Sequence, residues 1–126
     1  MALLGLLAAG GAARADWTLV VASGNLYSAY ADRGSVRRDG DRVTMLGLYD
    51  FGKGDRTPDG QPYLSTTVLR EYNCAGYAVR ILSYTDHAGR MGAGDVVSSV
   101  RRVGRWEAVH EGAMDEAFWK IACGRD

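Results

Sequence analysis

Short apolar runs separated by turn residues occupy most of this chain, and this alternation constrains its fold more than any other feature. The runs are rich in Val, Thr and aromatic residues, which favour β-strands, and Gly, Asp and Asn lie between them. The chain has 17 glycines and only two prolines, which suits many tight turns between short strands. The pattern predicts a β-rich domain with strand-like segments at residues 17–22, 26–31, 35–38, 42–51, 63–74, 77–85, 95–100 and 106–109.

The segment at residues 42–51 is predicted to be a central strand. An Asp-Gly step precedes it, at Asp39-Gly40-Asp41, and such a step between two strand-like runs is a strong hairpin signal. Apolar side chains fall on both faces of the segment: Val43, Met45, Tyr49 and Phe51 on one, with Gly47 among them, and Leu46 and Leu48 on the other. Neighbouring layers should therefore cover this strand from both sides.

The hydrophobic period changes near the C-terminus. Apolar residues recur there at helical spacing, at Met114, Ala117, Phe118, Ile121 and Ala122. Residues 112 to about 123 are therefore predicted to form one amphipathic helix. Asp115 and Glu116 lie in its first turn, where the helix dipole favours acidic groups, and Gly124 suits a C-terminal cap.

The first fifteen residues are predicted to be a signal peptide. An apolar run at residues 2–9 precedes Ala13-Arg14-Ala15, an A-x-A cleavage site that makes Asp16 the new N-terminus. No Lys or Arg precedes the run, and a short buried helix is the alternative; the run is too short to span a bilayer. The expected product is one exported domain, residues 16–126, without a transmembrane segment. Because no Cys follows the cleavage site, no lipid anchor is expected.

The two cysteines, Cys74 and Cys123, are predicted to form a disulfide. An even pair in a small exported domain favours a cross-link, because the compartment is oxidising. The bond would close a loop of about 50 residues and stabilise the fold by about 4 kcal/mol. Two buried free thiols are the alternative, and a zinc site is disfavoured because the cysteines lack the paired spacing that zinc sites use.

No residue pattern indicates catalysis, a metal or a cofactor. The only histidines are His87 and His110, both expected in solvated loops; Asp86 is adjacent to His87, but neighbouring residues on a strand point to opposite sides. The glycine pairs at 52–54 and 92–94 lack the third glycine of a dinucleotide fingerprint. A weak calcium-loop pattern at residues 55–60 has Thr57 and Thr66 where acids are required. The expectation is a protein that is not an enzyme.

The charge pattern argues against nucleic acid as a partner. Fifteen basic residues balance fifteen acidic ones, so no global field attracts a polyanion. Two basic clusters, Arg37-Arg38 and Arg101-Arg102 with Arg105, could meet polyanions, but adjacent strand residues divide their charge between two faces. The longest polar stretch, residues 52–62, is predicted to be a mobile surface loop and a contact region. Its neighbourhood offers Lys53, Asp55, Arg56 and Tyr63.

An ordered set of segments resembles the bacterial surface-adhesin protein E family and extends from Trp17 to Cys123. The segments are Tyr30–Arg38, Val43–Phe51, Glu71–Cys74, Tyr77–Arg80, Leu82-Ser83, Met91–Gly94, Trp106–Val109 and Ala122-Cys123. The resemblance implies an α+β fold: a mostly antiparallel sheet of about six strands with one C-terminal α-helix packed on it and disulfide-linked to it. It also implies adhesion without catalysis, with host matrix or serum proteins such as vitronectin, laminin and plasminogen as partners.

Two departures from the family pattern matter. The missing lipid-attachment Cys favours the periplasm over surface display, so a periplasmic structural or envelope-associated protein is the alternative function. Glu111-Gly112-Ala113 replaces the expected Pro-Gly-Ser, so the helix lacks a Ser cap, at a cost of about 1 kcal/mol. No binding residue can be carried over from the family. An open antiparallel sheet exposes its edges, which could bind a partner or form a homodimer.

Overall fold

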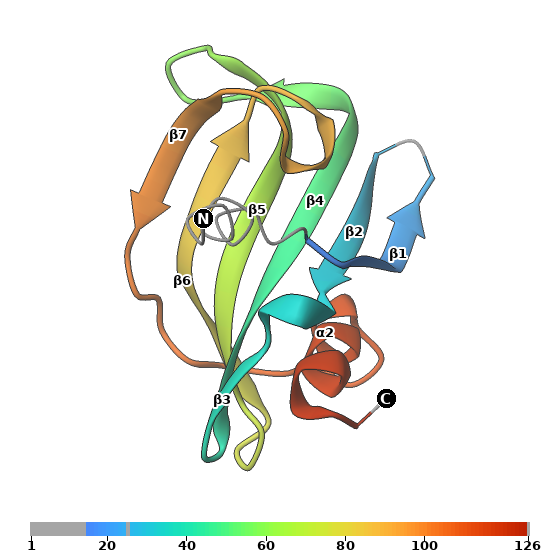
Figure 1. Ribbon diagram of the computed structural model, residues 1–126, viewed down its shortest axis with the longest axis vertical. Helices are drawn as coiled ribbons and strands as arrows, with labels where there is room; N and C mark the ends of the chain where they lie inside the picture. The colour runs from blue at the N-terminus through green and yellow to red at the C-terminus, as the bar shows by residue number, and fades with distance from the viewer. Residues whose placement is uncertain (1–14, 25, 126) are drawn as a thin grey trace, which may run out of the picture.

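The strand-like runs fold into one antiparallel sheet in the computed structural model, which describes residues 15–24 and 26–125. Six strands form its main path in the order β1-β2-β4-β5-β6-β7, β3 pairs with β4, and β8 pairs with β6, which makes eight strands in the described residues (Figure 1). The strands are β1 (Trp17–Ser23), β2 (Tyr27–Asp32), β3 (Arg37–Asp39), β4 (Arg42–Arg56), β5 (Pro62–Asn73), β6 (Ala78–His87), β7 (Val96–Arg101) and β8 (Glu107–Ala108). The other elements are the 3₁₀ turns η1 (Arg33–Ser35) and η2 (Arg90–Gly92) and the helix α2 (Met114–Cys123). The predicted α+β class is confirmed.

β4 is the long central strand that the sequence predicts. It is 15 residues long and pairs with β2 and β3 on one side and with β5 on the other. Both faces carry buried side chains: Val43 and Met45 belong to the core beneath α2, and Leu48 lies on the opposite face. The helix packs closely on Gly47, because a Cβ atom there would lie 3.3 Å from Cε1 of Phe118.

α2 covers one face at the lower end of the sheet (Figure 1). Phe118 and Trp119 are buried there, and the Trp119 indole N–H donates to the Asn73 carbonyl at 3.1 Å. The helix begins at Met114, two residues later than predicted, because Gly112 has a left-handed φ of 81° and Ala113 is extended. Ala113 provides no side-chain cap, as expected, and Gly124 ends the helix with a φ of 70°. No helix in the described part of the chain has the length and apolar character of a membrane span.

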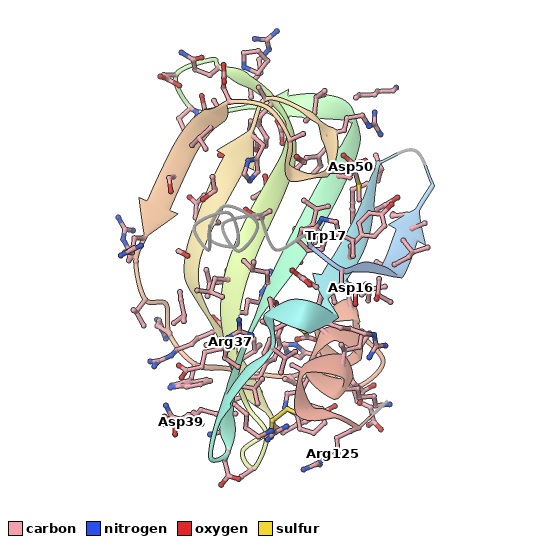
Figure 2. All side chains as sticks on the ribbon, in the orientation of Figure 1. Asp16, Trp17, Arg37, Asp39, Asp50 and Arg125 are labelled. Carbon is pink, nitrogen blue, oxygen red and sulfur yellow. A yellow bond between two sulfur atoms is a disulfide. The ribbon has the colours of Figure 1, made fainter. Side chains whose placement is uncertain are left out.

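The Cys74–Cys123 disulfide joins the residue after β5 to the last residue of α2. The two Cα atoms lie 5.7 Å apart, and both cysteines are buried. Figure 2 shows the bond at the lower end of the sheet. The predicted link between sheet and helix is therefore confirmed.

The longest predicted loop is largely strand. β4 continues to Arg56 and β5 begins at Pro62, so the turn between them is only residues 57–61. The register shifts between Asp50 and Asp55, where Gly54 has a φ of 78°, and the pairing of β4 with β5 resumes after this irregularity. The prediction of a mobile loop over residues 52–62 is therefore wrong. Likewise, β6 extends through His87, although this residue was predicted to lie in a solvated loop.

Candidate binding surface

The tip of the β4–β5 hairpin, at the top of Figure 1, is an ordered turn. The Thr57 backbone N–H donates to the Gln61 carbonyl at 2.9 Å, and the Gly60 N–H donates to the Thr57 carbonyl at 2.8 Å. The Thr57 hydroxyl accepts from the Gln61 N–H at 3.0 Å and donates to the Asp59 carboxylate. Arg56 donates from Nη1 to the Gly60 carbonyl at 2.8 Å. These contacts order the backbone of the turn and hold the Arg56 side chain against it.

A depression of about 300 Å³ lies beside this turn, and all four residues of the predicted contact region line it. Its lining is Lys53, Gly54, Asp55, Arg56, Pro62, Tyr63 and Leu64. Burial is the largest cause that raises the pKa of the Tyr63 hydroxyl, followed by the negative charges of Asp86 and Asp55. Tyr63 therefore stays a neutral hydrogen-bonding phenol at physiological pH. We call Lys53, Asp55, Arg56 and Tyr63 the hairpin-tip surface.

A row of aromatic rings leads from the hairpin-tip surface to the helix. The rings of Phe51 and Tyr63 lie 5.9 Å apart, and Tyr27 is opposite Phe51 in the β2–β4 register. The Tyr27 and Tyr49 rings are 6.0 Å apart, and the Tyr49 and Phe118 rings are 6.4 Å apart. Only Phe118 is fully buried, so the other rings offer partly exposed apolar area. The sequence placed Tyr49 and Phe51 on one face but could not show that Tyr27 and Tyr63 join them.

A second depression, of about 380 Å³, adjoins the first at Lys53. Gly24, Tyr27, Ser28, Asp50, Gly52 and Arg90 complete its lining. Arg90 forms an ion pair with the buried Asp50 at 3.2 Å, and the Met91 N–H donates to the same carboxylate at 3.1 Å. The Arg90 side chain is itself half exposed. The hairpin end of the sheet thus presents aromatic rings together with charges of both signs.

The two outer strands of the sheet, β1 and β7, carry exposed apolar side chains. Leu19 on β1 is 55% exposed, and Val96 on β7 is 60% exposed. β1 has no charged residue in its sequence, WTLVVAS. Proteins commonly protect such edges with charges, because an open edge can pair with another extended chain. Both edges are therefore possible sites of strand addition.

The side chains of Asp86 and His87, neighbours on β6, point to different faces of the sheet. The buried Asp86 carboxylate accepts from the Thr66 hydroxyl at 2.7 Å and from the Ser98 hydroxyl at 2.6 Å. His87 instead lies 2.9 Å from the Thr67 hydroxyl, and burial lowers the pKa of its imidazole. His87 is thus a half-buried, neutral strand residue and not the solvated loop residue that the sequence suggested. The Ser98 hydroxyl donates to a carboxylate, so no histidine base activates it.

The structure also places His110, the Arg37-Arg38 cluster and the weak calcium-loop pattern. His110 is exposed and pairs with Asp115 at 3.2 Å, in the turn before α2. Arg37 and Arg38 lie opposite Thr44 and Val43, so their side chains point to opposite faces, as predicted. In the weak calcium-loop pattern, the Asp59 carboxylate accepts from Thr57. Within the described ranges, no three His, Cys, Asp or Glu residues are grouped as metal ligands.

Comparison with known proteins gives a consistent result. The family described as surface-adhesin protein E matches residues 17–124. A crystal form II structure of Haemophilus influenzae protein E is similar at 17% identity with a TM-score of 0.72, covering 90% of this chain and 91% of that chain. Protein E from non-typeable Haemophilus influenzae is similar at 17% identity with a TM-score of 0.69, covering 90% of this chain and 79% of that chain. At these identities the structures establish a shared fold. No curated protein matches the chain significantly.

Proposed function

This chain belongs to the surface-adhesin protein E family, and we propose that its exported domain binds host extracellular-matrix or serum proteins and is not an enzyme. Vitronectin, laminin and plasminogen are the candidate partners, as the family resemblance implies. The family match over residues 17–124 is the observation that carries this proposal. An adhesin acts outside the cytoplasm, which agrees with the predicted leader and with the disulfide.

The hairpin-tip surface is the contact region that the geometry favours. Tyr63 presents an aromatic ring with a polar hydroxyl, and aromatic and Arg side chains carry much of the binding energy in protein interfaces. Lys53, Asp55 and Arg56 surround this ring with charges of both signs. Because the turn backbone and the Arg56 side chain are already hydrogen-bonded, less free energy is lost in ordering the tip when a partner binds.

A binding titration of vitronectin, laminin and plasminogen against the surface-immobilised domain tests the proposal directly. Saturable binding that persists as salt is raised would support specific recognition. Binding that disappears with modest salt would indicate non-specific charge attraction, since surface charges are screened over about 8–10 Å near physiological ionic strength. Failure to saturate with any of the three proteins, together with no partner captured from host-matrix extracts, would contradict the adhesin proposal.

A periplasmic structural role is the second candidate, and the uncharged edge strand β1 favours it. An apolar edge with exposed Leu19 is suited to pairing with a second copy of the chain. Sedimentation of the oxidised protein over a range of concentrations tests whether the chain self-associates through β1. A dimer that Leu19→Lys converts to monomer would support self-association through β1, and a monomer at all concentrations would exclude it.

A further inference from the structure

The carboxylate of Asp32 is buried at the end of β2 and receives two backbone hydrogen bonds. Its Oδ1 atom accepts from the Asp16 N–H at 3.0 Å and from the Gly34 N–H at 3.0 Å. The residue is only 7% exposed. The Ser35 hydroxyl donates to the Asp32 carbonyl at 2.7 Å and accepts from the Leu46 N–H at 2.8 Å. This network fixes the carboxylate between the start of β1 and the 3₁₀ turn η1.

The Asp32 carboxylate has hydrogen bonds from two backbone N–H groups, but no side chain in the described part of the chain forms an ion pair with it. Burial of an ionised carboxylate is costly unless an opposite charge accompanies it. One of its two donors is the backbone nitrogen of Asp16, and Asp16 is the residue that the A-x-A pattern makes the first of the exported chain.

We propose that Asp32 is the binding site for the chain's own N-terminal ammonium, which cleavage after Ala15 creates. The inference rests on that predicted cleavage. Hydrolysis of the Ala15–Asp16 peptide bond consumes one water and, at neutral pH, leaves a carboxylate on Ala15 and an ammonium on Asp16. The nitrogen that lies 3.0 Å from Oδ1 as an amide then carries a positive charge. A neutral hydrogen bond becomes a charge-assisted one, and such bonds are roughly twice as strong.

The ammonium would reach Asp32 without rearrangement of the fold. Trp17, the next residue, is paired with Asp32 in the β1–β2 register, and the Asp16 carbonyl accepts from the Arg33 N–H at 3.4 Å. Figure 2 shows Asp16 and Trp17 beside the end of β2. The ion pair would hold the first residue of the exported chain against the sheet. Because chain ends and outer strands open most readily, this pair protects β1 from fraying. Cleavage after Ala15 thereby adds an ion pair that holds β1 to β2.

A double-mutant cycle on two chain starts tests this site. One protein begins at Asp16, and the other carries Gly-Ser-Ala ahead of Asp16, which keeps the amide hydrogen bond but moves the ammonium about 10 Å away. Each is made with Asp32 and with Asp32→Asn, in the oxidised form. The extended protein should melt about 4–8 °C below the one that begins at Asp16, and Asp32→Asn should abolish this difference. Equal melting temperatures in the two proteins that keep Asp32, or an undiminished difference between the two that carry Asp32→Asn, would overturn the proposal.

Amine reactivity keeps the test decisive if Asp32→Asn does not fold. Acylation of the α-amine at neutral pH should be several-fold slower in the protein that begins at Asp16 than in the extended protein, with Lys53 as the internal reference. Equal rates would refute the ion pair. The site of cleavage is checked separately by the intact mass of the exported protein. A wrong cleavage site is therefore distinguishable from an amine that does not bind Asp32.

Discussion

Breaking the Cys74–Cys123 bond should lower the free energy of unfolding by about 4 kcal/mol. The two residues are 49 positions apart, and a cross-link over a loop of that length removes about 14 cal/mol/K of entropy from the unfolded chain, or about 4 kcal/mol at 25 °C. Domains of this size are typically stable by about 5–15 kcal/mol. The reduced protein should therefore keep its fold with only a fraction of its stability.

Urea unfolding of the oxidised and reduced proteins measures this difference in the free energy of unfolding. Both forms have the same sequence, so the difference reports the disulfide alone. Cys74→Ala combined with Cys123→Ala is the matched variant, and it should lose at least as much stability because it also removes two buried side-chain groups. A difference below about 1 kcal/mol between oxidised and reduced protein would refute the loop-entropy argument. Free-thiol titration of the unfolded, unreduced protein should detect no thiol.

The intact mass of the exported protein should correspond to a chain that begins at Asp16; a product that retains Met1 would contradict both the cleavage and the export. Gly47→Ala should destabilise the fold by about 1–3 kcal/mol, because the added Cβ lies 3.3 Å from Phe118 Cε1; an unchanged melting temperature would disprove the tight contact. Tyr77→Phe should raise the pKa of Glu116, since the Tyr77 hydroxyl, 2.5 Å from its carboxylate, is the largest cause of the lowered pKa. The stability that this hydrogen bond contributes through Glu116 is present above the unfolded-state pKa of Glu116 and is lost as pH falls through the lowered folded-state pKa. The stabilities of the unmodified protein and of Tyr77→Phe should therefore converge in acid; NMR titration of Glu116 checks the pKa shift. On the alkaline side, the same hydrogen bond raises the pKa of Tyr77 to about 12, so its contribution should be fully present below the ordinary tyrosine pKa and be lost as pH rises through the raised one.

The main elements of the fold were predictable because side-chain periodicity determines them locally. The central strand β4 and the C-terminal helix follow from alternating and helical spacing, and the left-handed Gly124 ends the helix where expected. The extension of β4 to Arg56 was not predictable from composition. Glycines and charges usually indicate a loop, but an exposed hairpin end tolerates charged side chains, and a register shift accommodates the glycines.

The candidate sites depend on strand register, which no local pattern in the sequence specifies. The hairpin-tip residues were identified because they are close in sequence, from Lys53 to Tyr63. The aromatic row was missed because Tyr27 meets Phe51 only through the pairing of β2 with β4. The contact between Asp16 and Asp32 likewise depends on the β1–β2 register. The Asp-Arg-Gly-Ser sequence at residues 32–35 could have indicated a capped turn, but not what the carboxylate binds.

The comparison that most directly tests binding through the hairpin-tip surface uses two single substitutions and one control. Tyr63→Ala removes the aromatic side chain, Lys53→Ala removes a charge that lines both depressions, and Arg105→Ala removes an exposed charge near the opposite end of β6. Each protein is first checked by its melting temperature and is then titrated against the host protein that binds the unmodified domain. We expect Tyr63→Ala to weaken binding at least about tenfold, Lys53→Ala to weaken it less, and Arg105→Ala to leave it unchanged. Unchanged affinity for a folded Tyr63→Ala protein would contradict binding through the hairpin-tip surface.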